Sequence, residues 1–291
     1  MILVVGSTGR LGREIVLDLL KGGEKVRAFV RHPSKERAHT LAEAGAELAY
    51  GDLRNTDSIV EACEGADVIV TCASAMGSQN PSDTFESVDR DGQLALASIA
   101  ERTNCTRFVF VSYPHQPEKS SLGAAKLDVE NHLASGRLPF TILRPTFFME
   151  TWLTPLLGFD YVEGRVRIYG SGTNPISWVS VSDVARMAAW STRREPQVND
   201  TIDFGGPQPL SPIEVVEIFE RLSGRAFDRE SVSDEKLEKQ YKNALDPRLR
   251  AFSAIACQYA RGYQPNFAAL PKGTPHPVVT VEEYARKALR R

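Results

Sequence analysis

The sequence predicts an α/β protein in which a doubly wound parallel sheet is followed by a smaller C-terminal α+β lobe. Short apolar runs alternate with amphipathic helical patterns along the first half of the chain, as in a parallel sheet with helices on both faces. After Arg144-Pro145, aromatic residues, prolines and glycines dominate positions 145–178, which predicts loops and short strands. We therefore expect a sheet domain over residues 1–150 and a smaller C-terminal lobe over 151–291, with parts of 179–205 returning to the sheet.

The strands and helices of the first domain follow from the period of their apolar residues. Strands are expected at Ile2–Val5, Lys25–Val30, Glu47–Tyr50, Val68–Cys72, Phe108–Ser112 and Phe140–Leu143. Helices are expected between them, near residues 10–21, 34–44, 56–63, 84–102 and 123–135. Gly22-Gly23 and Gly45 follow the first two helices, where glycine commonly ends a helix.

The second half of the chain carries separate signals for helices and for one late strand. In chain order they are a helix start near Ser182-Asp183, a strand at Thr201–Phe204, a capping box at Ser211-Pro212-Ile213-Glu214, helical residues over 233–263 with a break at Asp246-Pro247, and a helix cap at Thr280-Val281-Glu282-Glu283. The capping box has proline at the first helical position, where its missing N–H costs nothing.

The first strand runs into a glycine-rich turn, Gly6-Ser7-Thr8-Gly9-Arg10-Leu11-Gly12. In a strand–turn–helix unit, main-chain amides and the positive end of the helix point at one spot, which suits a pyrophosphate. Gly6 allows the tight turn, Gly9 lets a ligand approach the backbone, and Gly12 lets the helix pack close to the sheet. The spacing differs by one residue from the usual dinucleotide fingerprint, so glycines needed only for geometry are the alternative. The surrounding βαβ pattern favours a nucleotide.

Arg31 comes directly after the second strand, at the sheet edge where doubly wound proteins bind ligands. An acidic residue at this position selects NAD, whereas an arginine suits the 2′-phosphate of NADP. Arg10 and Lys35 add positive charge to the same corner. A solvated surface arginine is the alternative. The placement favours NADP(H) over NAD(H).

Two further strand ends carry candidate cofactor residues. Asp52 closes the third strand, where its carboxylate can accept from an adenine amino group while Leu53 packs on the ring. Aspartate at such a place also caps turns, which is the alternative. Cys72, Ala73 and Ser74 follow the fourth strand, and their small side chains leave room for a ribose and a pyrophosphate, although ordinary turn packing also explains them.

Composition excludes several classes of partner. A formal net charge of -2 gives no electrostatic reason to expect nucleic acid or an anionic membrane. No apolar run approaches the ~20 residues that span a bilayer, and the short N-terminal apolar stretch lacks the basic flank of a signal peptide. The 4 cysteines and 5 histidines show neither disulfide nor metal-ligand spacing. We expect a cytoplasmic protein with reduced cysteines and no metal.

Lys126 lies in a predicted helix, within the sequence Gly-Ala-Ala-Lys-Leu-Asp-Val-Glu at 123–130. A lysine there can hydrogen-bond a nicotinamide ribose and lower the pKa of a neighbouring group through its charge. However, most helical lysines face solvent, and Glu130 is spaced for an ordinary i,i+4 ion pair. From these residues by themselves, the surface interpretation is favoured.

Longer motifs run through most of the chain: the glycine turn, Val30-Arg31-His32-Pro33, Gly51-Asp52-Leu53, Phe108–Ser112, Lys126 with Glu130, residues 140–150 including Thr-Ile-Leu-Arg-Pro, and residues 178–185 including Val-Ser-Asp-Val-Ala. With these motifs the chain resembles the NmrA-like, atypical branch of the extended short-chain dehydrogenase/reductase superfamily. The resemblance implies a Rossmann-type domain that binds NADP(H), with Lys126 on the nicotinamide ribose.

The same resemblance places the residues after Arg144 beside the nicotinamide, namely Pro145, Thr146, Phe147 and Phe148. The aromatic-rich region that follows would shape a flat apolar substrate pocket, with the candidates Phe148, Met149, Trp152, Tyr161 and Trp178. Core filling is the alternative for these side chains.

The chain departs from the superfamily's catalytic signature of tyrosine, three residues and lysine. Leu122 holds the tyrosine position before Lys126, while Ser112 remains at the serine position with Tyr113 beside it; the candidate catalytic residues are thus Lys126, Ser112 and Tyr113. We expect an NADPH-dependent reductase of quinone-like or other conjugated aromatic acceptors, because their charge after hydride transfer is delocalised and water can supply the proton. The alternative is a non-catalytic NAD(P) redox sensor that acts through a protein partner.

Overall fold

The computed structural model describes residues 1–32, 36–195, 198–266 and 270–290. Its main sheet has seven strands, in the spatial order β10 (Asp200–Phe204), β6 (Phe140–Pro145), β5 (Arg107–Val111), β4 (Val68–Thr71), β1 (Ile2–Val5), β2 (Val26–Val30) and β3 (Glu47–Tyr50). The pairs from β6 to β3 are parallel. The chain order reverses beside β1, which is the topology of a Rossmann-type sheet, so the predicted fold class is confirmed.

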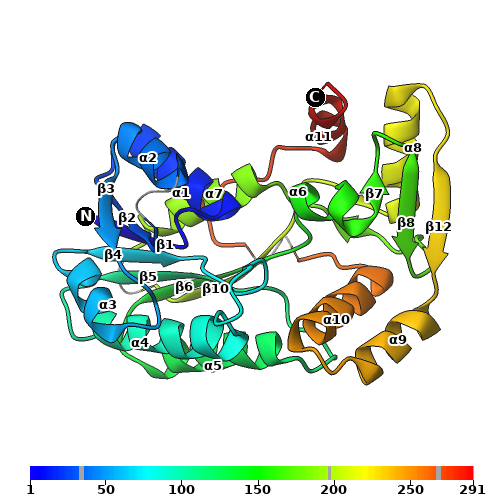
Figure 1. Ribbon diagram of the computed structural model, residues 1–291. Coiled ribbons are helices and arrows are strands. Elements are labelled where there is room, and N and C mark those ends of the chain that lie inside the picture. The colour runs from blue at the N-terminus through cyan, green and yellow to red at the C-terminus, as the bar shows by residue number, and fades with distance from the viewer. Residues whose placement is uncertain (33–35, 196–197, 267–269, 291) are drawn as a thin grey trace. The chain divides into compact units, whose positions relative to one another are not determined.

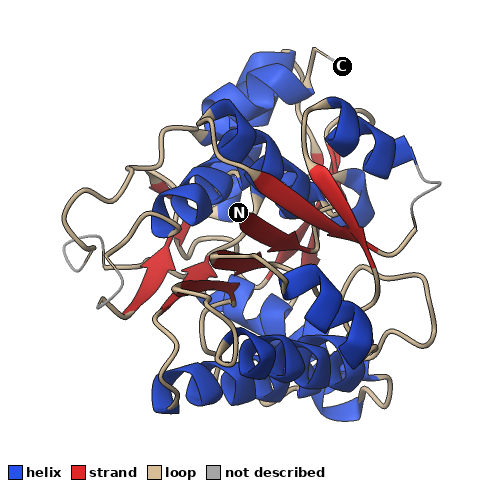
Figure 2. Ribbon diagram, turned by 90° about the vertical axis from the view of Figure 1, so that its left-hand side faces the viewer, coloured by secondary structure: helices blue, strands red, loops and turns tan. Residues whose placement is uncertain are grey.

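Helices cover both faces of this sheet (Figures 1 and 2). On one face lie α1 (Arg10–Lys21), α2 (Glu36–Glu43) and α7 (Val181–Ser191), and on the other lie α3 (Thr56–Cys63), α4 (Gln93–Ala100) and α5 (Ser121–Ser135). The strands β1 and β3 and the helices α1 and α3 have the predicted bounds. The strand β6 continues two residues beyond the predicted Leu143.

The helix predicted over 84–102 is in fact two segments. Residues Phe85–Gly92 form the π-helix η1, and α4 follows it directly. The wider turn brings Asp89 and Gln93 to the loop after β4: the Asp89 carboxylate accepts from the Ala75 amide at 2.8 Å, and the Gln93 amide donates to the Ala73 carbonyl at 3.2 Å. Periodicity in the sequence does not distinguish a π-helix from an α-helix, and π-turns often occur at functional sites.

The chain divides into two compact units. The first contains Met1–Tyr113, Ser121–Arg144 and Val184–Ile202, and the second contains Pro114–Ser120, Pro145–Asp183 and Asp203–Arg291. The boundary between the two units therefore falls after Arg144, whereas the sequence predicted it after residue 150. Val184–Ile202, which lies inside the predicted segment 179–205, belongs to the first unit. Residues 114–120 join the second unit, where the Glu118 carboxylate pairs with both terminal nitrogens of Arg261 at 2.6 and 2.7 Å.

The second unit consists of short strands and helices, as the sequence predicts. In chain order its elements are α6 (Met149–Trp152), η2 (Pro155–Leu157), β7 (Phe159–Asp160), β8 (Arg165–Tyr169), β9 (Ile176–Ser177), β11 (Pro209–Leu210), α8 (Pro212–Ser223), β12 (Asp228–Val232), α9 (Asp234–Asn243), α10 (Pro247–Arg261) and α11 (Val281–Ala288). The predicted break at Asp246 is confirmed, because its side chain caps α10 by accepting from the Leu249 amide.

The predicted capping box at the start of α8 is also confirmed. The Ser211 hydroxyl accepts from the Glu214 amide at 3.3 Å, and the Glu214 carboxylate accepts from the Ser211 amide at 2.7 Å. Hydrogen bonding by Ser211 keeps the pKa of Glu214 below its ordinary value.

Replacing Ser211→Ala should therefore lower the free energy of unfolding by about 1 kcal/mol, the usual cost of losing an N-cap. Urea unfolding followed by circular dichroism measures this change. Ser135→Ala is the control, because the Ser135 hydroxyl only bonds back to carbonyls of its own helix, and its effect should stay within about 0.5 kcal/mol. Equal stability of the two variants would contradict a capping role.

Candidate functional site

The glycine turn is built as close packing of main chain. Gly6 has a φ of +85°, and a Cβ on it would lie 2.8 Å from the Ala73 nitrogen. A Cβ on Gly12 would lie 2.1 Å from the Gly6 carbonyl oxygen. Gly6 must be glycine because of its left-handed backbone, and Gly12 must be glycine because α1 approaches the turn too closely for a side chain. Gly6 thus forms the tight turn, and Gly12 lets α1 pack closely against the main chain of that turn.

Gly9 differs from the other two glycines. Its backbone angles, φ -72° and ψ 166°, are ordinary for any residue, and a Cβ there would meet only the Gly6 carbonyl oxygen at 3.2 Å. Gly9 is the N-cap of α1 and provides no side-chain acceptor for the first amides of the helix. An uncapped helix start beside open space is suited to an anion.

The Ser7 side chain points into the sheet, where its hydroxyl donates to the Phe29 carbonyl at 2.8 Å and is fully buried. The Ser7 side chain is therefore not placed to meet a ligand. Arg10 begins α1, followed by the half-buried Leu11. The Thr8 carbonyl accepts from Arg37 at 3.3 Å. Cofactor contact by Ser7, Thr8, Arg10 and Leu11 stays a prediction.

The loop after β4 lies beside the glycine turn. In register, Val5 of β1 pairs with Thr71 of β4, so both strands end at the same edge. The Cys72 thiol lies 3.6 Å from the Val5 carbonyl oxygen, and burial raises the pKa of this thiol to about 12. Cys72 is therefore a small neutral group at neutral pH, as are Ala73 and Ser74 after it, and all four cysteines are free.

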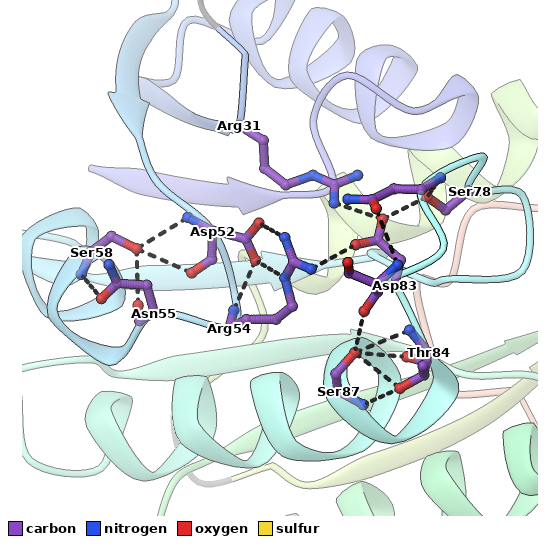
Figure 3. A network of polar contacts seen from close by, with 11 residues as sticks. Arg31, Asp52, Arg54, Asn55, Ser58, Ser78, Asp83, Thr84 and Ser87 are labelled. Atoms are coloured by element: carbon purple, nitrogen blue, oxygen red, sulfur yellow. Dashed lines mark hydrogen bonds and ion pairs between the residues drawn. The ribbon is translucent and has the colours of Figure 1, made fainter.

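Arg31 lies in a network of charged groups at the ends of β2 and β3 (Figure 3). Its guanidinium donates to the Asp83 carboxylate at 2.7 Å. Arg31 is thus an ion-paired arginine whose side chain is 40% exposed. The predicted charge at Lys35 lies outside the described residues.

Asp52 takes part in the same network through Arg54. Its two carboxylate oxygens accept from Nε and Nη2 of Arg54 at 2.9 and 2.7 Å, and the Arg54 amide donates to it as well. Hydrogen bonding from Arg54 lowers the pKa of Asp52. The turn-capping interpretation of Asp52 is thus realised, while contact of Asp52 and Leu53 with adenine stays a prediction.

Arg54 and Asp83 are charged residues of this corner that the sequence did not point out. Arg54 follows the Gly51-Asp52-Leu53 motif directly, and this position next to the motif could have identified it from the sequence. Asp83 lies 52 residues after Arg31, in a loop before η1, and only the folded chain brings it to this edge.

Lys126 is buried, with 6% of the residue exposed, which overturns the surface interpretation. Its ammonium lies 3.4 Å from an oxygen of the fully buried Asp89 and 3.3 Å from the Val111 carbonyl, over the ring of Phe110. The alternative ion pair with Glu130 also fails to describe the site, because the Glu130 carboxylate binds Arg144 through two nitrogens, at 2.5 and 3.2 Å. Burying a lysine costs free energy unless a group of opposite charge pairs with it, and Asp89 is that partner here.

Ser112 follows β5 directly, and Leu122 lies in α5, the helix that carries Lys126. The Ser112 hydroxyl is buried and has no hydrogen-bond partner among the described residues. Leu122 is buried in α5, one turn before Lys126. Tyr113 follows the strand and is half-buried. A buried hydroxyl without a partner costs free energy unless a ligand or water satisfies it.

The remaining candidates belong to the second unit, and most of them fill its core. Rings of Phe147, Trp152, Trp178 and Tyr259 are in contact, with 4.9 Å between the centroids of Trp152 and Tyr259. Met149 and Trp178 have no exposed surface, and the Trp178 indole donates to the Leu210 carbonyl at 2.8 Å. For Met149, Trp152 and Trp178 the core-filling alternative therefore describes the structure.

Phe148 and Tyr161 keep partly exposed side chains, so substrate contact stays a prediction for these two. Pro145 and Thr146 are buried, and the Thr146 hydroxyl donates to the Ser177 carbonyl. Their contact with a nicotinamide ring also stays a prediction.

Metal-ligand clusters and membrane-spanning helices are both absent from the described residues. No group of three or more histidine, cysteine, aspartate or glutamate side chains is arranged there to hold a metal ion. Within the same residues, every helix is too short or too polar to cross a lipid bilayer.

The sequence as a whole matches a sequence model of the NmrA-like family over residues 1–277. The chain belongs to the NmrA-like family. Photosystem II assembly factor Ycf39 of Trieres chinensis is 29% identical to this NmrA-like protein, over 77% of this chain and 70% of its own length. The isoflavone reductase homolog IRL of Zea mays is also 29% identical, over 99% of this chain and 98% of its own.

Solved structures share the fold of this NmrA-like protein. An NADPH-dependent quinone oxidoreductase of Escherichia coli, in complex with NADPH, superimposes with a TM-score of 0.78 and 18% identity, over 99% of this chain and 100% of its own. At this identity the likeness concerns the fold.

Proposed function

We propose that this protein is an NADP(H)-dependent reductase that transfers hydride to a quinone-like or other conjugated aromatic acceptor. The observation that carries the proposal is the buried Lys126–Asp89 pair at the end of β5. The next residue after the carbonyl that Lys126 contacts is Ser112, whose buried hydroxyl has no hydrogen-bond partner within the described part of the chain. A buried ion pair contributes little net stability compared with apolar packing. Its place at the ligand edge of a doubly wound sheet therefore favours a role in binding.

The residues of the first unit fit a phosphorylated dinucleotide. The open backbone at Gly9 and the uncapped start of α1 would hold the pyrophosphate. Arg31 would hold the 2′-phosphate, and Lys126 would hold the nicotinamide ribose, with Ser112 as a further hydrogen-bonding group. When bound, NADPH supplies a hydride from its nicotinamide ring.

The side chains around Lys126 explain the proposed acceptor class. Leu122 cannot donate or accept a proton, so the helical turn before Lys126 offers no acid for a developing alkoxide. A conjugated acceptor spreads its negative charge and takes a proton from water, so catalysis consists mainly of positioning. The Asp89 carboxylate, 3.4 Å from the Lys126 ammonium, would hold this group in position beside the cofactor.

The relatives support a reductase more than a protein-assembly role. The isoflavone reductase homolog aligns with nearly the whole chain, whereas the assembly factor leaves about a quarter of it unmatched. The solved structure of similar fold is a quinone oxidoreductase that uses NADPH.

The test is NADPH oxidation, followed by absorbance at its reduced-nicotinamide band, with a panel of quinones, azo dyes and triarylmethane dyes. We expect turnover above background with at least one conjugated acceptor and none with simple ketones. Saturable NADPH binding without oxidation of NADPH by any acceptor would instead favour the non-catalytic sensor.

A further inference from the structure

Asp83 lies at the centre of a cluster of four charged side chains, Arg31, Asp52, Arg54 and Asp83, which we name the Asp83 cluster (Figure 3). Asp83 is 2% exposed. One of its carboxylate oxygens, Oδ2, accepts from the Ser78 hydroxyl at 2.5 Å and from Arg31 at 2.7 Å. The other, Oδ1, lies 3.4 Å from Nη1 of Arg54. Two arginines from consecutive strand ends therefore converge on one buried carboxylate.

Asp83 is negatively charged at neutral pH. Burial by itself would raise the pKa of this carboxyl, but hydrogen bonds from Ser78 and Arg31 and the charges of Arg31 and Arg54 outweigh burial, so the pKa lies below its ordinary value. The cluster thus holds two positive and two negative groups, and its formal charge is zero.

The contacts of Arg54 with Asp52 use only part of its guanidinium group and leave Nη1 to face a second anion. Its Nε and Nη2 form a two-point contact with Asp52, which leaves Nη1 directed at Asp83. The loop that carries Arg54 is held in turn by Ser58, whose hydroxyl accepts from the Asp52 amide at 3.1 Å. The Arg54 side chain is 31% exposed and the Arg31 side chain is 40% exposed, so both remain partly accessible to solvent.

A carboxylate and a phosphate are alternative partners for a guanidinium, because both accept paired N–H bonds. A phosphate monoester carries about -1.5 to -2 charges at neutral pH. A 2′-phosphate that binds Arg31 must therefore share that arginine with the negative charge of Asp83. Without Asp83 the cluster would have a net positive charge.

We propose that Arg54 is a second arginine for the 2′-phosphate of NADP(H), and that Asp83 is a built-in competitor of that phosphate. In the free protein Asp83 occupies the arginines, and in the complex its charge opposes the phosphate. The chain's preference for NADPH over NADH is thus set by Asp83 against Arg31 and Arg54. This inference rests on the proposed use of NADP(H).

The test compares dissociation constants for NADPH and NADH, by cofactor fluorescence, in the unaltered protein and three variants. Asp83→Asn keeps an oxygen acceptor for Ser78 and Arg31 but removes the charge, so the preference for NADPH should rise at least about fivefold, the effect of one unit charge at contact distance in water. Arg54→Gln should weaken NADPH binding about tenfold or more, as a lost charge-assisted hydrogen bond does, and leave NADH binding nearly unchanged.

Glu86→Gln is the matched control, because it removes the same charge from a carboxylate that faces Arg90 on the surface of η1. Its preference should equal that of the unaltered protein. A preference for NADPH that is unchanged or reduced in Asp83→Asn would overturn the role of Asp83. If Asp83→Asn does not fold, Arg54→Gln decides, and equal losses for NADPH and NADH would overturn the inference. If the unaltered protein binds neither cofactor, the proposed function and this inference both fail. If it binds NADPH but the variants behave as described above for overturning, only this inference fails.

Discussion

Replacing Lys126→Met should lower the free energy of unfolding by about 3 kcal/mol or more, because it leaves Asp89 as a fully buried carboxylate without its ion-pair partner. The same change should lower kcat/KM for NADPH-dependent quinone reduction about 100-fold or more, since one preorganised hydrogen-bond donor is lost. Urea unfolding and steady-state kinetics measure the two effects.

A second substitution separates the structural loss from the catalytic one. In Lys126→Met with Asp89→Asn, the amide oxygen can still accept from the Ala75 amide while the buried charge is gone. We expect most of the stability to return and the activity to remain lost. Lys242→Met is the control, because Lys242 is an exposed lysine paired with Glu238 on its own helix, and its effect should stay within about 0.5 kcal/mol.

Two outcomes would contradict this account of Lys126. Unaltered cofactor affinity and turnover in Lys126→Met would return the lysine to a purely structural role. Recovery of activity in the double variant would show that Asp89, rather than the lysine, causes the loss.

Gly12→Ala should destabilise the protein by at least about 2 kcal/mol, because a Cβ at this position would lie 2.1 Å from the Gly6 carbonyl oxygen and 2.9 Å from the Ser7 Cα. The sign of the stability change decides between the clash and helix propensity. Helix propensity by itself predicts that alanine inside α1 stabilises the chain by about 1 kcal/mol relative to glycine. The clash is with main chain, which cannot turn aside as a flexible side chain can. Thermal unfolding monitored by calorimetry gives the sign.

Gly9→Ala is the matched partner of this prediction. Its backbone angles suit alanine, and the new Cβ would meet only one atom, at 3.2 Å. We expect a Tm close to that of the unaltered protein together with weaker NADPH binding, because the methyl group occupies the space through which a pyrophosphate approaches. Equal Tm values for the two alanine variants would show that α1 moves to accommodate Gly12→Ala. Unchanged NADPH affinity in Gly9→Ala would exclude the turn as the pyrophosphate site.

The sequence signals for individual elements were strong where they depended on neighbours along the chain. Short apolar runs identified β1 and β3 to the residue, and the caps Ser211, Asp246 and Thr280 marked the starts of α8, α10 and α11. The π-helical turn η1 was missed, because its hydrophobic spacing resembles that of an α-helix over so few residues.

The aromatic residues of the second unit show a different limit. Their enrichment after Arg144 predicted a substrate pocket, yet Met149, Trp152 and Trp178 pack into a core cluster. A large apolar side chain gives the same sequence signal whether it meets a ligand or another ring. Only the contacts of the folded unit distinguish the two cases.

The sequence by itself determined the Rossmann-type sheet, the glycine turn and the position of Arg31 after β2. Each of these depends on the spacing of nearby residues and on the backbone conformations that single residues can adopt. The tertiary structure decided that Lys126 is buried against Asp89, and that Arg31 shares Asp83 with Arg54. Such ion pairs join residues far apart in the chain and leave no periodic trace. Their formation depends on which strand ends the parallel sheet brings to the same edge.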